Sequence, residues 1–435
     1  MSRDPLGVSA GRWGPYAVAG ALILGDFLLL SRGLTHANAG YKTWSLDHGV
    51  YSDSIKLSLD HYVRGAHVIH PLPYLHDRIE YPVLLGFALW LPAWLPGGPP
   101  TWFAAAGLMT AAATFGSIAL IRRRAPRSVW WIAASPALLL DAGINWDLIG
   151  ILFLVGGVVW FGERRFGLSG ASTAAGTFFK LFPVVLAPLA LSALASRWWR
   201  STGQPDRPRD DLDAAWPPGM AAESSPRAEL ARWLVPFAVV SLVVMMPFLV
   251  LARSNTLWFF HFNDLRPQKD SIWEMLSKIV GAPAVSNHAV NTASLLVVMA
   301  SVAYGAWMVW RAPNPEHARA VALATAMAII VWMAVNKVWN PQYVLWIFAV
   351  GAVTSMPPRF GVALGVLSVY DYWFEFHLRL PDRPIGAYSW VGDVSVLARV
   401  AIFAVMVAWA IGELRRLAAA PVPIMTEGIP APSRS

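Results

Sequence analysis

Residues 14–31 read GPYAVAGALILGDFLLLS, an apolar run of the length that a helix needs to cross the hydrocarbon core of a bilayer. Similar runs recur as far as residue 412, so one membrane domain accounts for nearly the whole chain. Of the 435 residues, 56% are hydrophobic, only 14% are charged and 23 are Trp. The sequence therefore predicts an all-α polytopic membrane protein and not a soluble enzyme with a single anchor.

Composition also excludes several classes of function. The sequence contains no Cys, which rules out disulfides and thiolate chemistry. Its net charge of +8 comes from arginines that cluster between apolar runs, as membrane topology requires, so we expect no nucleic-acid partner. The P-loop, Rossmann, HExxH and GxSxG patterns are absent from the sequence, and His261 and His288 lack metal-ligand spacing. We therefore expect no cofactor and no metal site.

The positions of the basic residues predict how the chain crosses the membrane. By the positive-inside rule, Arg3 and Arg12 place the N-terminus in the cytoplasm, and Arg415 does the same for the other end. We expect about twelve crossings in the plasma membrane, with both termini cytoplasmic. The expected spans are 14–31, 101–121, 128–143, 147–161, two halves of 166–195, 233–252, 290–310, 318–335, 341–356, 359–376 and 389–412.

Four segments between or beyond these spans have distinct compositions. Residues 81–96 are short and carry three prolines, which predicts a juxtamembrane helix at the outer interface. Loops 32–80 and 253–289 are expected outside, and 197–232, rich in Pro, Asp, Arg and Ser, as a flexible cytoplasmic linker. The membrane domain is thus residues 1–416, and the Ala/Pro-rich tail 417–435 is expected to be disordered.

The first outer loop carries carboxylates, among them Asp53 in Tyr51-Ser52-Asp53 and Glu80 in Glu80-Tyr81-Pro82. Because a carboxylate is costly in hydrocarbon, the loop must face water or a cavity at the membrane surface. There Asp53 can act as a general base that takes a proton from an acceptor hydroxyl. The alternative is an ordinary solvated loop acid.

Asn145-Trp146-Asp147 opens an otherwise uncharged span, with Asp141 one turn earlier. Acids at such a boundary are functional by default, although either Asn145 or Asp147 can equally serve as a helix N-cap.

Lys180 is the single cation in an apolar stretch that is broken by Pro183. A lysine beside such a break suits a phosphate headgroup, because the break also frees backbone N–H groups for an anion. The alternative is a lysine that snorkels to the interface.

Two further polar connections follow. Residues 336–343, which include Lys337 and Gln342, offer amides, a cation and an aromatic ring for a sugar or phosphate, or form a simple turn. Tyr370-Asp371-Tyr372 and Glu375-Phe376-His377 lie near a helix end, and for them a structural role and a ligand-binding role both stay open.

In this order the residues resemble polytopic glycosyltransferases of the GT-C class that use polyprenyl-phosphate sugars, above all actinobacterial glycosyltransferase family 87. The resemblance rests on Asp53, on Gly65 before Pro73-Tyr74 and Glu80-Tyr81-Pro82, and on the small-residue helix that leads to Lys180 and Pro183. It covers the layout of residues 14–412. It implies a GT-C-type bundle of about twelve transmembrane helices plus the outer juxtamembrane helix.

The resemblance also implies the activity: transfer of a sugar, mannose in the first instance, from a polyprenyl-phosphate donor to a lipid or glycan acceptor at the outer face. Asp53 would be the base, Asp147 would share the acid role or position the substrate, and Lys180 would bind the donor phosphate. The aromatic-rich loop 253–289 would shape the acceptor side. The expected substrate-binding residues are Lys180, Glu80, Tyr81, Asn145, His261, Lys337 and Gln342.

Three alternatives stay open. A transporter or flippase of lipid-linked sugars would need broken helices at the bilayer midplane, in paired halves, whereas the sequence shows one broken segment. An arabinosyltransferase of the same class differs only in the sugar. A structural partner in a cell-envelope complex is the third.

Overall fold

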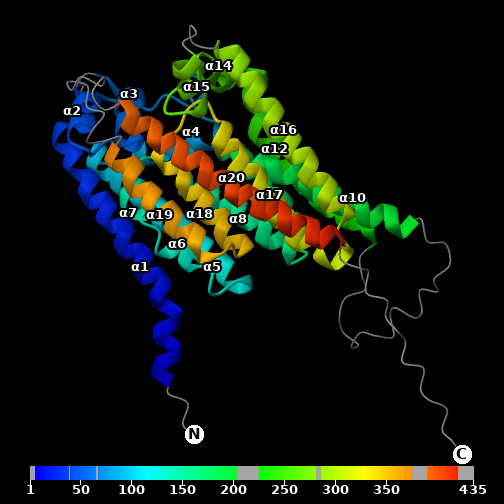
Figure 1. Cartoon of the computed structure of the whole chain (residues 1–435). Coiled ribbons are helices and arrows are strands. Elements are labelled where there is room, and N and C mark those ends of the chain that lie inside the picture. The colour runs from blue at the N-terminus through cyan, green and yellow to red at the C-terminus, as the bar shows by residue number, and fades with distance from the viewer. Residues whose placement is uncertain are drawn as a thin grey trace, which may run out of the picture.

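The computed structural model describes residues 5–38, 40–64, 67–202, 225–280, 286–374 and 389–419. In these residues the chain forms one long helical bundle with a smaller group of segments at one end (Figure 1). The bundle helices are α1 (Pro5–Ser31), α5 (Pro99–Arg124), α6 (Trp130–Ala133), α7 (Ala137–Leu140), α8 (Asp147–Gly162), α9 (Phe166–Phe179), α10 (Leu186–Thr202), α12 (Pro226–Leu251), α16 (Asn287–Arg311), α17 (His317–Val335), α18 (Val344–Thr354), α19 (Pro358–Trp373) and α20 (Ser389–Ala419).

Two connecting segments, residues 32–98 and 252–280, fold at the same end of the bundle, which we call the cap end (Figure 1). Short 3₁₀ turns, η3 (Phe182–Val185), η4 (Asn314–Glu316) and η5 (Pro341–Tyr343), join bundle helices. The cap contains η1 (Arg32–His36), α2 (Tyr41–Asp47), α3 (Asp53–Tyr62), the two-residue strands β1 (Val63–Arg64) and β2 (His67–Val68), α4 (Val83–Trp90), η2 (Leu91–Trp94), α13 (Arg253–Thr256), α14 (Trp258–Leu265) and α15 (Ile272–Val280). The strands pair antiparallel.

Seven helical segments in the described part of the chain are long and apolar enough to cross a membrane. They are Trp13–His36, Pro99–Arg124, Phe182–Thr202, Pro226–Leu251, Asn287–Arg311, Asn314–Val335 and Trp390–Ala419. The chain is therefore a polytopic membrane protein, and its described part is built mainly from helices. The finer expectation of about twelve crossings in a GT-C-type bundle stays a prediction, because helices such as α8 and α18 are apolar but shorter.

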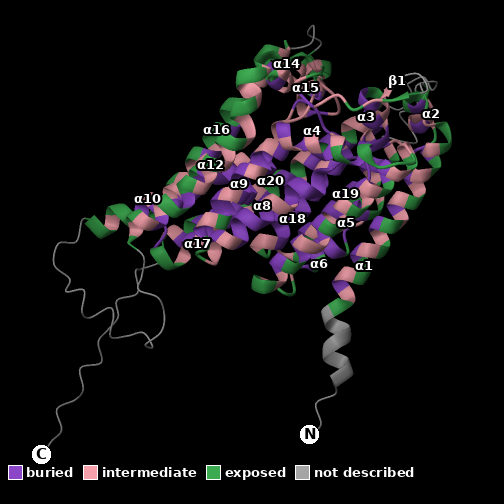
Figure 2. Ribbon diagram, turned by 180° about the vertical axis from the view of Figure 1, so that it is seen from behind, coloured by how far each residue is buried: buried purple, intermediate pink, exposed green. Residues whose placement is uncertain are grey.

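Burial separates the centre of the bundle from its rim. In the most apolar stretch of the segment that contains α17, 67% of the residues are buried, whereas in the most apolar stretch of α12 none is buried. Figure 2 shows the buried residues gathered on α8, α9, α18 and α17, with exposed residues along α12 and α16. Small side chains along α17, such as Ala324 and Ala328, allow its neighbours to approach closely.

Basic side chains mark the helix ends that lie opposite the cap. They occupy the last turns of α5 (Arg122 to Arg124), α10 (Arg200), α16 (Arg311) and α20 (Arg416). A cation at a helix C-terminus is favourable for the helix dipole. These four helix ends lie at one end of the bundle (Figure 1), and the side of the membrane that this end faces stays a prediction.

The structure corrects the span expected at 128–143. This segment forms two four-residue helices, α6 and α7, and not one continuous helix. Pro136 lies between them, and its missing N–H and its ring weaken a helix at this point, where the chain breaks. Ser135 turns the chain there, since its hydroxyl accepts the N–H of Ala137 at 3.2 Å.

The break expected at Lys180 is confirmed: α9 ends at Phe179, Lys180 is extended, and η3 and α10 follow. Residues 81–96 also contain a short helical segment, α4 with η2, as expected.

The boundaries of the expected linker 197–232 were wrong, because α10 continues to Thr202 and α12 begins at Pro226. Polar contacts anchor both flanks: Arg197 binds Glu229 at 3.2 Å, and Arg200 donates to the carbonyl of Ala312 at 2.9 Å. The expected disordered tail also starts too early, since α20 reaches Ala419. Residues 203–224 and 420–435, Gly65 and Glu375 to His377 lie outside the described residues.

Candidate functional site

A cavity of about 1200 Å³ opens at the cap end, between the cap and the bundle. Segments far apart in sequence line it, from α2 and α3 through the start of α10 to α14, α16 and η5. Six basic and four acidic side chains take part: Lys42, Lys56, Lys180, Arg266, Lys269 and Lys337 with Asp53, Asp60, Glu80 and Asp264. The excess of cations suits a ligand that carries negative charge.

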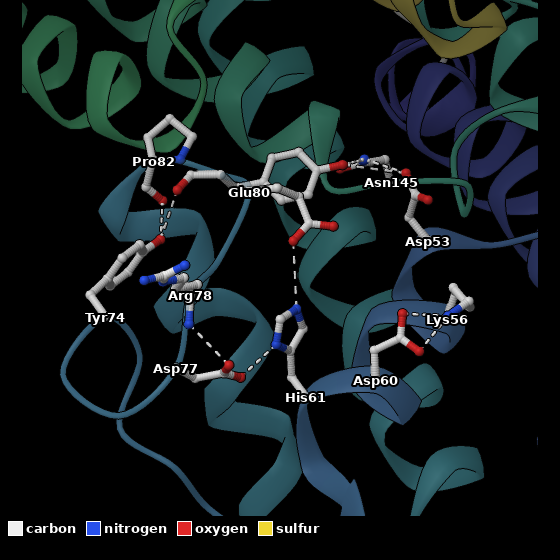
Figure 3. Close-up of polar contacts among 11 residues, drawn as sticks. Asp53, Lys56, Asp60, His61, Tyr74, Asp77, Arg78, Glu80, Pro82 and Asn145 are labelled. Carbon is white, nitrogen blue, oxygen red and sulfur yellow. Dashed lines mark hydrogen bonds and ion pairs between the residues drawn. The ribbon is translucent and has the colours of Figure 1, made fainter. Parts of the chain in front are cut away.

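Asp53 is an acid of the cavity that accepts several hydrogen bonds. It is the first residue of α3, whose N-cap Ser52 accepts the N–H of Ser54 at 3.2 Å. Its Oδ1 accepts from the hydroxyl of Tyr51 at 2.7 Å. Its Oδ2 accepts from Asn145 Nδ2 at 2.8 Å (Figure 3). Burial raises the pKa of Asp53, while these hydrogen bonds and the nearby Lys180 lower it in part. Asp53 is thus not an ordinary solvated loop acid.

Tyr81 connects the acid to the cation. Its hydroxyl accepts from Asn145 Nδ2 at 2.8 Å and lies 3.4 Å from Asp53 Oδ2. Its ring centroid lies 4.8 Å from Lys180 Nζ, a distance at which the ring attracts the ammonium. Asp53 and Lys180 therefore face one cavity, with a single tyrosine between them.

Lys180 is held inside the protein by a buried ion pair. Its Nζ lies 3.4 Å from the carboxylate of Asp147, whose Oδ1 also accepts the indole N–H of Trp346 at 2.8 Å. Only 7% of the residue is exposed, so the lysine does not snorkel to the surface. Asp147 lies behind it and is not among the lining residues, and both of its oxygens bind these two partners instead of capping α8. This geometry makes Asp147 a residue that positions Lys180.

Glu80 is oriented by a histidine that the sequence analysis did not single out. His61 Nδ1 lies 2.6 Å from Asp77 Oδ2, and its Nε2 lies 3.6 Å from Glu80 Oε2 (Figure 3). Burial lowers the pKa of His61, but its two carboxylate partners outweigh that effect and raise it to about 9. Burial also tends to raise the pKa of Glu80, and His61 brings the net value below its usual range. His61 lies eight positions after Asp53, a helical spacing that could have revealed it.

The remaining predicted residues divide into two groups. Lys337 and the buried Gln342 line the cavity, and Lys337 Nζ donates to the carbonyl of Asp264 at 3.0 Å. His261 does not line it: it is an exposed residue of α14 whose ring lies 5.2 Å from that of Trp258.

Arg266 is a cavity residue that sequence reasoning missed. It follows α14, and within the described chain its guanidinium forms no ion pair or hydrogen bond. Backbone bonds hold its segment, because Lys269 N donates to Lys337 O at 3.0 Å and Trp339 N donates to Lys269 O at 2.9 Å. The charge of Arg266 also lowers the pKa of Asp53 to a small extent. The signal in the sequence was a lone arginine shortly after the aromatic run 258–262.

An apolar wall continues the cavity along the bundle. It is formed by η3 and the start of α10 on one side and by one face of α16 on the other. The apolar residues on this face of α16 recur at helical spacing over about 10 Å. Two of their side chains, Leu295 and Met299, are more than half exposed. The wall residues are Leu181, Phe182, Val184, Val185, Pro188, Leu295, Val298, Met299, Val302 and Trp332.

No protein-family model matches this chain, and no curated protein matches its sequence. Among the residues with assigned positions, no group of three His, Asp or Glu side chains is arranged to hold a metal ion. The features that bear on function are those of the cavity: a hydrogen-bonded carboxylate, Lys180 and Arg266 among the lining cations, and an apolar wall.

Proposed function

We propose that this chain is a membrane glycosyltransferase that moves a sugar, mannose in the first instance, from a polyprenyl-phosphate donor to a hydroxyl of a lipid or glycan acceptor. The observation that carries the proposal is that Asp53 and Lys180 face one cavity across Tyr81. A carboxylate for the incoming hydroxyl and a cation for the departing phosphate are the two groups that such a transfer needs.

The cationic side of the cavity suits the donor phosphate. Lys180 shares its charge with Asp147, whereas Arg266 has no partner in the described chain and is free to form charge-assisted bonds to phosphate oxygens. The apolar wall between α10 and α16 suits the prenyl chain, because burial of each methylene group contributes about 0.8 kcal/mol to binding. A donor that diffuses in the bilayer needs no nucleotide-binding fold.

The acidic side suits the acceptor. Asp53 takes the proton of the acceptor hydroxyl while that oxygen forms a bond to the anomeric carbon of the sugar. The bond between this carbon and the phosphate oxygen breaks, and its electron pair leaves with the polyprenyl phosphate. Lys180 and Arg266 stabilise the charge on the leaving group. Attack on the face opposite the phosphate inverts the anomeric centre.

The proposal includes the finer expectations of a GT-C-type bundle, a cavity at the outer face of the plasma membrane and cytoplasmic termini. An arabinosyltransferase of the same class fits the cavity equally, because phosphate and prenyl chain dominate donor recognition. A transporter fits less well: the break at Lys180 opens towards the cap-end cavity, whereas a transporter uses paired broken helices at the midplane.

The test compares wild-type protein with Asp53→Asn in vesicles that contain polyprenyl-phosphate mannose, with a panel of alkyl mannosides as acceptors. Wild-type protein should release polyprenyl phosphate only when an acceptor is present. The Asn variant should be slower by about 10²- to 10⁴-fold, the usual contribution of a general base. Asp393→Asn is the control, because Asp393 lies on α20 and binds Lys278 outside the cavity.

Full activity of Asp53→Asn would remove Asp53 from the base role. Movement of the intact donor between leaflets, without release of polyprenyl phosphate, would favour the transporter.

A further inference from the structure

Asp26 is a fully buried carboxylate of α1 that the proposed reaction does not use. An acid inside a membrane helix is costly and is retained where it has a specific partner. The partner of Asp26 is a backbone group: its Oδ2 accepts the N–H of Gly143 at 2.5 Å, across 117 positions of sequence. Gly143 lies in the turn 141–146, which joins α7 to α8.

This turn carries the segment that begins α3. Gly143 O accepts the hydroxyl of Ser52 at 2.6 Å, and Ile144 O accepts the N–H of Asp53 at 2.8 Å. The next residue, Asn145, donates from its side chain to Asp53 Oδ2 at 2.8 Å. Three successive residues of the turn therefore bind Ser52 and Asp53, and Asp26 holds the first of the three.

The turn also packs directly on α1. A Cβ atom at Gly143 would lie 2.8 Å from Leu30 Cδ1, 3.2 Å from Phe27 Cε2 and 3.3 Å from Asp26 Oδ2. A larger residue there would push against the side chains of Leu30, Phe27 and Asp26, which line this face of α1. The hydrogen bond and the close contact together fix the distance between α1 and the turn.

We propose that Asp26 is a positioning residue that seats the turn 141–146 on α1 and thereby orients the carboxylate of Asp53. Without an acceptor, the buried N–H of Gly143 would be left unpaired, and the turn would move to find another partner. As far as catalysis is concerned, the inference rests on the function proposed above. A base displaced by about 1 Å slows the reaction about 10²-fold while the substrate still binds.

The experiment compares Asp26→Leu, which removes the acceptor, with Asp26→Asn, whose amide oxygen can still accept from Gly143. Thr114→Val is the control, since the hydroxyl of Thr114 is buried in α5 and donates only to Thr110 O of its own helix. In the vesicle assay, kcat of the Leu variant should fall about 10- to 100-fold with an unchanged KM for the donor. The Asn variant should recover most of the loss.

A second readout does not depend on activity. Hydrogen exchange, followed by mass spectrometry, should be faster in Asp26→Leu both in the turn 141–146 and in residues 52–54. The Thr114→Val protein should exchange as the wild type does in both peptides. Faster exchange in residues 52–54 is the decisive observation, because Asp26 bonds to the turn, and the turn bonds to Ser52 and Asp53.

Each outcome has a definite meaning. Wild-type exchange of both peptides in Asp26→Leu overturns the inference, whatever the activity. An unchanged kcat in that variant, beside an active wild type, overturns it as well. A wild type that transfers no sugar contradicts the proposed function, and the exchange measurement still tests the seating of the turn. If Asp26→Leu does not fold, Gly143→Ala, whose methyl group crowds the side chains of Asp26, Phe27 and Leu30, serves in both measurements.

Discussion

The hydroxyl of Tyr51 donates to Asp53 Oδ1 at 2.7 Å, which makes it a sensitive probe of the proposed base. A base must be ionised to accept a proton, so activity should fall as the pH falls through the pKa of Asp53. Burial raises this pKa above its ordinary value, and the hydrogen bond from Tyr51 opposes that rise. Tyr51→Phe removes this hydrogen bond and so raises the pKa of Asp53 further, and the acid limb of the pH profile should move to higher pH.

The size of this effect follows from the strength of the bond. A hydrogen bond to a charged group contributes about 1.5–3 kcal/mol, and about 1.4 kcal/mol corresponds to one pH unit. Asn145 and Tyr81 still contact Asp53 in the variant, so the lower end of this range applies. We expect the limb to move upward by about one pH unit, with kcat/KM on the alkaline side within about twofold of wild type.

The assay measures kcat/KM against pH for release of polyprenyl phosphate in vesicles. Tyr370→Phe is a matched control, because the hydroxyl of Tyr370 donates to Val391 O, and Tyr370 does not line the cavity. An acid limb that stays in place, or moves to lower pH, would refute the assignment of Asp53 as the group that titrates.

Three further predictions concern the cations and the acid that holds one of them. Lys180→Met should raise the KM for the donor by about tenfold or more, which a donor titration measures; an unchanged KM would return Lys180 to a structural role. Asp147→Asn should lower the melting temperature in thermal unfolding, because breaking a buried ion pair costs about 3–5 kcal/mol. Arg266→Gln should weaken donor binding by about tenfold, whereas Arg253→Gln, outside the cavity, should not. Equal donor affinity of these two variants would remove Arg266 from the phosphate site.

Some of this fold was predictable because it depends on neighbouring residues. The length of the apolar runs predicted membrane-spanning helices, and Pro183 beside a lone lysine predicted the break after α9. The same reasoning failed at 128–143, where the length of the run outweighed Pro136 and concealed a break. The linker boundaries failed for another reason, because contacts such as Arg197 with Glu229 extend helices into a polar sequence.

The candidate site was predictable only in its parts. Asp53, Glu80, Asn145 and Lys180 were singled out as polar groups beside apolar helices, and all four line the cavity. His261 was also singled out as a polar group, but it lies exposed on α14 and does not line the cavity.

Sequence alone determined that this protein lies in a membrane and where several of its helices end, because hydrophobicity, proline and charge act within a few residues. Tertiary structure alone decided which of those ends meet. Lys180 faces Asp147 across 33 positions, Asn145 faces Asp53 across 92 and Gly143 faces Asp26 across 117. The physical reason is that helix packing, and no local preference, brings these groups together, and a buried polar atom is stable only where packing supplies its partner.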